Sequence, residues 1–190
     1  MAREVEVKAR VEDRELARKI EAIGGRFVRE VAQEDLYFRH PCRDLRERDE
    51  ALRLRREGKN YTLTFKGRRV GKGAKMRAEL EVRVGDFDEA VALLERLGFE
   101  KAFVIKKRRR EFALDEAIIA LDSVEGLGEF VEIEMMATAE EGKGELQRME
   151  SFKKKLFSMS DRLGIPKGQL TTESYLELLA SKSSSSKALR

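Results

Sequence analysis

The stretch EVEVK, residues 4–8, alternates charged side chains with valines. Successive side chains of a β-strand point to opposite faces, so Glu4, Glu6 and Lys8 would share one face while Val5 lies on the other. The same alternation returns at LRLR (52–55), TLTFK (62–66), ELEV (79–82), VIKKR (104–108) and VEIE (131–134). Each stretch is therefore predicted to form a strand with one charged face and one apolar face.

The charged faces of these strands carry acids and bases together. A buried charge without a partner is costly, so such faces must be solvated, paired with opposite charges or loaded with metal. Each strand taken alone is explained as well by a sheet that turns its charged face to bulk water. The repetition of acids and bases at two-residue spacing favours instead one sheet that curls around a tunnel lined by these side chains.

The length of 190 residues corresponds to about one domain. The 40 lysines and arginines nearly balance the 36 acidic residues, and the net charge of +4 favours anionic partners only weakly. Acids and bases are interleaved almost everywhere, whereas a nucleic-acid-binding protein gathers its bases into a patch. Nucleic acid is therefore a disfavoured partner, although KKRRR at residues 106–110 is a local exception.

Cysteine content and hydropathy indicate the compartment. A single cysteine, Cys42, excludes an internal disulfide, and no Cys/His cluster is present to hold zinc. No apolar run approaches the ~20 residues of a membrane span, and the N-terminus lacks the apolar core of a signal peptide. We expect a cytoplasmic protein without membrane contact, and the 40% of charged residues with rare Asn and Gln is typical of a thermophilic source. The sequence leaves a homodimer open.

The order of predicted elements gives an α+β fold. Strands are expected at residues 4–11, 26–30, 34–39, 51–56, 61–66, 78–84, 103–114, 117–122 and 129–136, and helices at 13–24, 86–98, 140–163 and 172–180. Residues 67–75 are predicted to form a basic, glycine-rich loop. A single domain, residues 1–181, would contain all of these elements, and the polar segment 182–190 is predicted to be a disordered tail.

The chain contains two Glu-X-Glu strands, each followed by a predicted helix that begins at an aspartate and ends at a glycine. This shared order suggests an internal duplication, for which a chance resemblance is the alternative. Two halves related by a pseudo-twofold axis would place Glu4 and Glu6 opposite Glu79 and Glu81 around a common centre.

VEIE places two carboxylates, Glu132 and Glu134, in an otherwise apolar segment. Carboxylates on adjacent same-face positions can bind one hard cation, and Mg²⁺ or Mn²⁺ takes oxygen ligands from protein, water and substrate phosphates. The bases would match a triphosphate with forked Arg donors and Lys point charges. They are Lys8, Arg53, Arg55, Lys66, Lys106 and Arg108. No GxxxxGK[ST] stretch is present, which excludes an ordinary P-loop site.

EVEVK resembles the ExExK signature of the CYTH superfamily, the triphosphate tunnel enzymes. Further blocks follow that family's order: QEDLYF (33–38), HPCRDLRERDEALRLRREG (40–58), LTFKG (63–67), AELEVRV (78–84), VIKKRRREF (104–112), IALDSVEGLGEFVEIE (119–134) and SYLELL (174–179). The resemblance covers nearly the whole chain, from Glu4 to Leu179. Among the subfamilies, these blocks are most similar to the class IV adenylyl cyclases.

The resemblance implies an eight-stranded antiparallel β-barrel, the triphosphate tunnel, with helices packed outside. It implies that this tunnel binds a nucleoside or other organic triphosphate with Mg²⁺ or Mn²⁺. The implied metal or metal-water ligands are Glu4, Glu6, Glu132 and Glu134, with Asp122 and Glu81 in support. The implied phosphate-binding residues are Lys8, Arg53, Arg55, Lys66, Lys106 and Arg108, and Lys8, Arg53 and Lys66 are expected to act in catalysis. Which alternate side chains of KKRRR face the tunnel stays open, so Lys107 and Arg109 could bind the phosphates in place of Lys106 and Arg108.

Two reactions fit the implied site. In an adenylate cyclase, which we expect first, the ribose 3′ oxygen of ATP attacks the α-phosphorus, and cyclic AMP and pyrophosphate result. In a triphosphatase, water attacks the terminal phosphorus of inorganic, thiamine or nucleoside triphosphate. The alternative outside these enzymes is a polyanion- or RNA-binding module that uses residues 106–110, binds with steep salt dependence and does not need Glu132 or Glu134. Tyr37 and Tyr175 are predicted to pack the rim, with substrate contact as the alternative.

Overall fold

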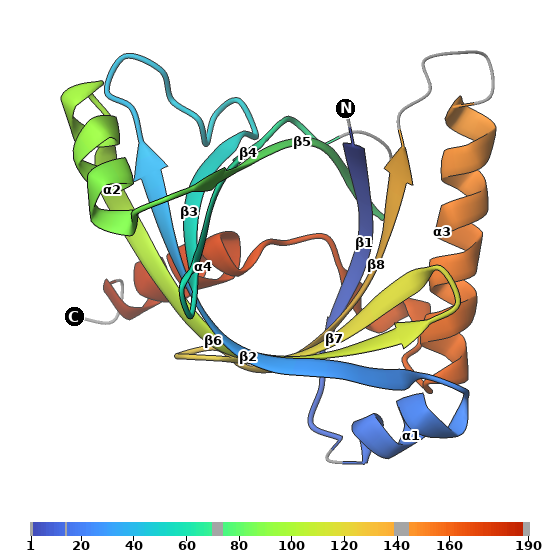
Figure 1. Cartoon of the computed structure of the whole chain (residues 1–190). Helices are drawn as coiled ribbons and strands as arrows, with labels where there is room; N and C mark the ends of the chain where they lie inside the picture. Colours follow the sequence, from blue (N-terminus) through green and yellow to red (C-terminus); the bar gives the residue numbers. More distant parts are fainter. Residues whose placement is uncertain (1, 14, 70–73, 139–144, 188–190) are drawn as a thin grey trace.

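Eight antiparallel strands form a closed barrel (Figure 1). The computed structural model describes residues 2–13, 15–69, 74–138 and 145–187. The strands are β1 (Ala2–Arg10), β2 (Arg26–Arg39), β3 (Ala51–Glu57), β4 (Asn60–Lys66), β5 (Lys75–Val84), β6 (Glu100–Leu114), β7 (Ala117–Val124) and β8 (Gly128–Thr138). Their order is β5-β4-β3-β2-β6-β7-β8-β1, and pairing between β1 and β5 closes the ring. The predicted eight-stranded antiparallel barrel is confirmed.

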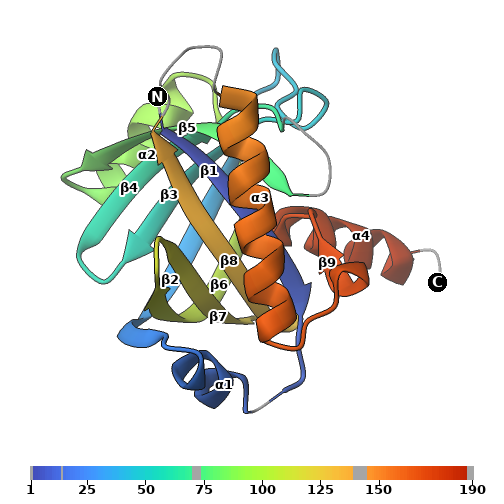
Figure 2. The same ribbon diagram turned by 90° about the vertical axis from the view of Figure 1, so that its right-hand side faces the viewer.

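Helices pack against the outside of this barrel. They are α1 (Leu16–Ala22), α2 (Phe87–Arg96), α3 (Glu145–Arg162) and α4 (Tyr175–Lys187). α3 lies along β1 and β8 (Figure 2), and α4 contacts β6. A short strand, β9 (Leu170–Thr171), pairs with β1. Among the helices in the described part of the chain, none is both long and apolar enough to span a membrane.

The strand order has the symmetry that the duplication predicts. β1 pairs with β5, and β2 pairs with β6, so equivalent strands of the two halves are neighbours. The outer neighbours are equivalent as well, because β8 lies beside β1 where β4 lies beside β5. The two Glu-X-Glu strands therefore lie side by side in the barrel wall, and their charged faces share one interior.

The apolar faces of the strands point outward, and most of them pack beneath the helices, whereas Leu80 and Val82 of β5 are more than half exposed. Val5 and Ile133 join Leu156 of α3 in one buried cluster. Leu54 joins Val91 of α2 in a second cluster. Burial of these side chains is the main favourable contribution to folding, and it leaves the charged residues of the Glu-X-Glu, LRLR and VEIE segments facing the inside of the barrel. The arrangement with charges over the exterior and an apolar middle is not observed.

One strand is longer than predicted. β2 is continuous from Arg26 to Arg39, whereas the sequence predicts two strands with a break after Glu30. Val31 and Gln33 keep their pairing with β6, opposite Arg109 and Lys107, with irregular register only nearer the two ends of β2. The partner strand therefore fixes an extended conformation that local sequence does not reveal.

Three helix boundaries can be compared with the prediction. Asp13 accepts a hydrogen bond from the backbone N–H of Glu15 at 2.8 Å, but α1 begins only at Leu16 and is not capped by that side chain. Asp86 does cap α2, because its carboxylate accepts from the N–H of Glu89 at 2.8 Å. α4 continues to Lys187 and so extends into the segment predicted as a tail. Within the predicted loop and third helix, residues 70–73 and 140–144 lie outside the described residues.

Candidate active site

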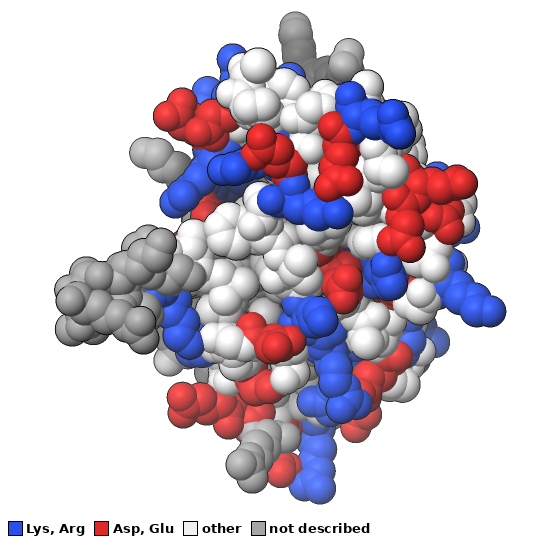
Figure 3. Space-filling view, turned by 90° about the vertical axis from the view of Figure 1, so that its left-hand side faces the viewer, with Lys and Arg blue, Asp and Glu red and all other residues white. Residues whose placement is uncertain are grey.

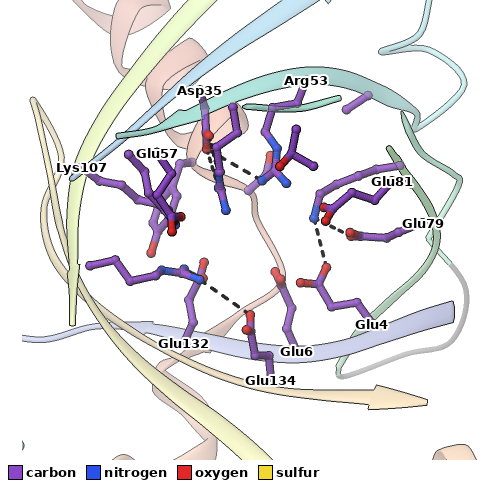
Figure 4. Close-up of a pocket in the computed structure, with 18 of the residues that line it drawn as sticks. Glu4, Glu6, Asp35, Arg53, Glu57, Glu79, Glu81, Lys107, Glu132 and Glu134 are labelled. Carbon is purple, nitrogen blue, oxygen red and sulfur yellow. Dashed lines mark hydrogen bonds and ion pairs between the residues drawn. The ribbon is translucent and has the colours of Figure 1, made fainter. Parts of the chain in front are cut away.

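A cavity of about 470 Å³ lies inside the barrel (Figure 4). Its walls come from β1 to β6 and from β8, together with Ser174, Tyr175 and Leu176 at the start of α4. The predicted site residues that line it are Glu4, Glu6, Lys8, Arg53, Arg55, Lys66, Glu81, Glu132 and Glu134. The barrel thus brings together side chains from both ends of the chain.

A row of four acids follows one side of the tunnel, and further acids line its other sides (Figure 4). Glu132, Glu134, Glu6 and Glu4 follow one another along β8 and β1. The register explains this row, since Glu6 lies opposite Glu134 in the antiparallel pair and alternation turns both inward. Arg53 of β3 faces this row from across the tunnel. We call this row of four acids the carboxylate wall, and the wall opposite it carries bases together with an acid, since Arg53 and Arg55 lie beside Asp35.

Lys8 is buried between the carboxylate wall and α4. Its Nζ lies 2.8 Å from Oε1 of Glu132 and 3.8 Å from Oε1 of Glu6, and it donates to the carbonyl of Glu173 at 3.4 Å. Burial by itself would lower the pKa of Lys8, but attraction to Glu132 and Glu6 outweighs it and raises the pKa. The ammonium group is therefore charged and held in place.

Lys66 joins the two Glu-X-Glu strands. Its Nζ lies 3.1 Å from Oε2 of Glu4 and 2.5 Å from Oε1 of Glu79. Burial opposes the charge on Lys66, but Glu4 and Glu79 together raise its pKa. The predicted approach of Glu4 and Glu79 around a common centre is observed, with a lysine between them.

Asp122 of β7 fixes two bases of β6. Arg109 donates to it through Nε at 2.7 Å and Nη2 at 2.6 Å, and Nζ of Lys107 lies 2.9 Å from Oδ2. Arg109 also contacts Glu132. Burial would raise the pKa of Asp122, yet the positive charges of Lys107 and Arg109 lower it. These ion pairs hold both bases at the tunnel surface.

β6 turns Lys107 and Arg109 into the tunnel and turns Lys106 and Arg108 outward. The outer two side chains are 59% and 75% exposed, and they pair with acids on the outer face of β2. The prediction that Lys106 and Arg108 line the tunnel is therefore wrong, and the alternative parity is observed. The same strand carries Phe112 and Leu114 in the buried cluster beneath the helices.

The two acids expected to support a metal have different surroundings. Asp122 has 0% exposed surface and does not line the cavity, because its oxygens accept from Lys107, Arg109 and the hydroxyl of Tyr175. Glu81 does line the cavity, where Oε2 accepts from Oγ1 of Thr64 at 3.2 Å. The expectation for Asp122 is corrected by this geometry: it holds bases in place and does not face the cavity.

Asp35 is a tunnel residue that the sequence reasoning missed. Arg55 donates to it through Nε at 2.6 Å and Nη2 at 2.7 Å, and Nη1 of Arg53 lies 3.8 Å away. Burial would raise the pKa of Asp35, but Arg53 and Arg55 hold it well below its usual range. Arg53 also donates to Thr64 at 3.2 Å, while its buried Nε has no partner within the described protein. An unpaired buried donor favours an anionic ligand at this place.

Arg77 lines the cavity although it was not predicted as a site residue. Tyr37 and Tyr175, which were predicted to pack the rim with substrate contact as the alternative, line the cavity as well. Arg77 lies on the same face of β5 as Glu79, so the two-residue spacing could have identified it had the predicted strand begun before Ala78. It pairs with Asp49, and its buried Nε has no partner among the described atoms. Tyr175 enters the wall through the packing of α4, which no local pattern signals.

Two acids of the tunnel have strongly raised pKa values. Burial, with the negative charges of Glu4, Glu132 and Glu6, raises the pKa of Glu134 to about 7 despite the opposing effect of Arg109. Burial and the neighbouring Glu4 raise the pKa of Glu79 to about 7 as well. Acids that hold their protons this strongly lie where a cation would be stabilising.

The donor chemistry of this wall fits Mg²⁺ or Mn²⁺, which prefer carboxylate oxygens. As the side chains stand, no three His, Cys, Asp or Glu residues within the described ranges form a group that could hold a metal ion. All four acids of the wall lie within ion-pair distance of a base: Glu6 and Glu132 of Lys8, Glu4 of Lys66, and Glu134 of Arg109. A cation would have to compete with these bases for the oxygens.

Comparisons with known proteins agree with this geometry. Residues 2–175 match the CYTH domain. A Methanocaldococcus jannaschii protein named "Putative adenylate cyclase" is 32% identical over 92% of this chain and 97% of its own length. A solved structure from Pyrococcus horikoshii is 36% identical with a TM-score of 0.80, covering 94% of this chain and 99% of that one. A Hippeastrum protein described with a dominant triphosphatase activity has a TM-score of 0.67 at 19% identity over 96% of each chain, which shows the shared fold alone.

Proposed function

The chain belongs to the CYTH domain family, and from this premise we propose that its tunnel binds a triphosphate with Mg²⁺ or Mn²⁺ and hydrolyses it at the terminal phosphorus. Processing of triphosphates is the function at the level of the family. The observation that carries the proposal is the cavity of about 470 Å³ in which bases face a row of carboxylates. Phosphoryl transfer needs chiefly such positioned charge.

The bases of the tunnel are suited to phosphate oxygens. Ion pairs with carboxylates hold four bases in position, so their charges are already in place before a ligand binds. These bases are Lys8, Arg55, Lys107 and Arg109. Arg53 lies farther from its carboxylate partner, Asp35, and its Nε has no partner among the described residues. This Nε could donate a hydrogen bond to a phosphate oxygen. Pre-positioned donors stabilise the charge that develops on the transferred phosphoryl group without further reorganisation.

The carboxylate wall would hold the metal. Glu4, Glu6, Glu132 and Glu134 supply the oxygen donors, and Glu81 lines the same cavity. When bound there, Mg²⁺ or Mn²⁺ would neutralise phosphate charge and lower the pKa of an attacking water. The protein's own part is to keep these acids together, although burial, and then repulsion from the neighbouring acids, raises the pKa of Glu134.

Hydrolysis is favoured over cyclisation by the polarity of the lining. The cavity wall contains few apolar side chains, namely Tyr37, Ala51, Met136, Tyr175 and Leu176. The ring of Tyr175 is covered by Lys8 at 3.9 Å from its centroid, and Met136 is 58% exposed. A nucleobase usually binds against a free apolar or aromatic face, whereas a triphosphate needs only the charges.

Cyclisation of ATP to cyclic AMP and pyrophosphate is the second candidate. It is favoured by the name of the Methanocaldococcus relative, which is 32% identical over 92% of this chain. Both reactions would use the same walls and differ in which phosphorus atom meets the nucleophile. A polyanion-binding module is not favoured, because Lys106 and Arg108 are paired with acids, and bases alternate with acids over the face shown in Figure 3.

The decisive assay supplies inorganic tripolyphosphate and ATP in turn, each with Mg²⁺, with Mn²⁺ and with chelator. We expect metal-dependent release of inorganic phosphate from both substrates. Glu134→Gln should lower turnover about a hundredfold, because it replaces a charged metal ligand with a neutral one that has a single oxygen, while leaving the pair of Lys8 and Glu132 intact. Glu129→Gln is the matched control, since Glu129 is an exposed residue of the same strand.

The products separate the candidate functions. Cyclic AMP and pyrophosphate from ATP, without phosphate release from tripolyphosphate, would replace hydrolysis by cyclisation. Turnover that survives both chelator and Glu134→Gln would overturn the metal assignment. Absence of any product from either substrate under all conditions would overturn the enzyme proposal itself.

A further inference from the structure

Tyr175 opens α4, and its side chain forms part of the tunnel wall. The residue is only 7% exposed, and its ring packs edge-on against Phe130 with centroids 5.1 Å apart. This contact fixes the plane of the ring, so its faces and its hydroxyl point in defined directions.

The faces and the hydroxyl of Tyr175 all meet charged groups of the tunnel. Nζ of Lys8 lies 3.9 Å from the ring centroid and Nζ of Lys107 lies 5.1 Å from it, both within the range of cation–π attraction. The hydroxyl donates to Oδ2 of Asp122 at 2.9 Å. One aromatic side chain from a C-terminal helix therefore contacts two lysines of the tunnel and the acid that holds one of them.

Asp122 links the hydroxyl of Tyr175 to two bases of β6. The carboxylate that accepts from Tyr175 also accepts from Lys107 at 2.9 Å and from Arg109 at 2.7 Å. Asp122 has no exposed surface, so bulk water does not compete with the hydroxyl for its oxygens in the folded protein. Loss of this hydrogen bond would free one lone pair of Asp122 and loosen the two bases that share its oxygens.

We propose that Tyr175 is a positioning residue that sets the places of Lys8 and Lys107 for a bound phosphate chain. The inference rests on the proposed function of the tunnel. It makes the docking of α4 a condition for strong anion binding, although α4 contributes no charged group to the cavity wall.

Tyr175 makes more contacts than apolar packing alone would require. Tyr175 belongs to a buried cluster with Ile105, Val124 and Leu127, which a leucine could also complete. A leucine would supply neither a π face for two ammonium groups nor a donor for a buried carboxylate. The two kinds of contact can be removed separately, because phenylalanine keeps the ring and loses the hydroxyl.

The test measures binding of inorganic tripolyphosphate by titration calorimetry without added metal, so that hydrolysis does not interfere. We expect Tyr175→Phe to weaken binding about threefold to fivefold through loss of one hydrogen bond to a charged group. Tyr175→Leu should weaken it about tenfold or more, because the cation–π contacts are lost as well. Leu179→Ala is the matched control, since Leu179 packs in the same cluster from the same helix and does not line the tunnel.

Steady-state kinetics with tripolyphosphate and Mg²⁺ supply a second readout. The same variants should lower kcat/KM by at least these factors, with kcat falling as KM rises, because the two lysines hold the phosphate chain both in the bound substrate and in the transition state. Circular dichroism and the unfolding midpoint check that each variant is folded, and Tyr175→Phe, which preserves the packed ring, keeps the test valid if Tyr175→Leu does not fold.

Each outcome decides the inference. Graded weakening from wild type through Tyr175→Phe to Tyr175→Leu, with Leu179→Ala unchanged, supports it. Equal weakening in Leu179→Ala and Tyr175→Leu overturns it in favour of plain helix docking, and unchanged binding in both tyrosine variants overturns it outright. If wild type binds no tripolyphosphate, the proposed function fails, and this inference fails with it.

Discussion

β6 presents the same residue types to two different surroundings. Lys107 and Arg109 face the tunnel with side chains that are 3% and 6% exposed. Their sequence neighbours Lys106 and Arg108 face outward and are 59% and 75% exposed. The difference teaches that the closed barrel, and not the residue type, decides whether a base in this run belongs to a site or to the surface.

The energetic weight of the ion pairs differs between the two faces in the same way. The outer pairs, Lys106 with Glu34 at 3.6 Å and Arg108 with Glu30, are screened by water and salt, so each is worth about 0–1 kcal/mol. Inside, removal of one partner leaves a buried charge uncompensated, which typically costs about 3–5 kcal/mol. Variants in matched positions on the two faces can therefore sharpen or break the comparison.

The largest effect is expected for Arg109→Ala. This variant should lower the free energy of unfolding by about 3–5 kcal/mol, because Asp122 and Glu132 lose a shared buried counter-charge. Arg108→Ala should change it by less than about 0.5 kcal/mol, as is usual for an exposed substitution. Urea unfolding followed by circular dichroism at pH 7 measures both values.

Arg109→Lys is the intermediate case, since it keeps the positive charge and loses the fork of donors to Asp122. Its loss of stability should lie between those of the two alanine variants. Similar losses for Arg109→Ala and Arg108→Ala would mean that the tunnel interior is as well solvated as the outer surface, and the comparison would fail.

A second pair of variants tests the acids of β2. Asp35→Asn should lower the free energy of unfolding by about 2–3 kcal/mol, because Arg55 donates two hydrogen bonds to the charged carboxylate. Glu34→Gln, at the adjacent outward position, should cost less than about 0.5 kcal/mol. The same urea titrations give both values.

The pH dependence of the Asp35 effect has a definite sign. The pKa of Asp35 in the folded protein lies below the value of 3.8 that is ordinary for an aspartate. The stability that Asp35 contributes is therefore fully present above that value and is lost as the pH falls below it. A difference between wild type and Asp35→Asn that stayed constant from pH 6 down to pH 3 would contradict the ion pair.

The sequence could predict most of the barrel because alternation and turn residues are local signals. Two-residue spacing placed Glu4, Glu6 and Lys8 on one face, and the barrel turns that face inward as expected. Glu132 and Glu134 follow the same rule on β8. The duplication predicted that the two Glu-X-Glu strands face a common centre, but it did not predict that β1 and β5 pair directly, because a twofold axis relates equivalent strands without making them neighbours.

The errors arise where local spacing is ambiguous. In a run of five consecutive bases, residues 106–110, either parity gives a charged face. Phe112 and Leu114 could have resolved the parity, because they share the outward face with Lys106 and Arg108 and pack in the core beneath the helices. The roles of Asp122 and Tyr175 depend on contacts between segments far apart in the chain, which a single sequence does not encode as a pattern.

The smallest of the expected effects concerns Lys107 and appears only as a pH dependence. Burial, followed by repulsion from Arg109, lowers the pKa of Lys107 from 10.5 to about 8, against the attraction of Asp122. Between these two values the unfolded chain binds a proton that the folded protein has released, so the stability of wild type rises with pH in this window. Lys107→Met removes this pH dependence of the free energy of unfolding. Lys106→Met, at the exposed neighbouring position, leaves it unchanged.

Urea unfolding at several pH values between 7 and 10 therefore compares the inner and outer faces of β6 again, through the pH dependence of these two variants. The free energy of unfolding of wild type should increase relative to Lys107→Met by about 1–2 kcal/mol over this range, below the limit of about 1.4 kcal/mol per pH unit for one proton. The difference between wild type and Lys106→Met should stay flat. A wild-type advantage over Lys107→Met that shrank as the pH rose would mean that Asp122 outweighs burial. Lys107 would then be a permanently charged member of the tunnel, equivalent to Lys8.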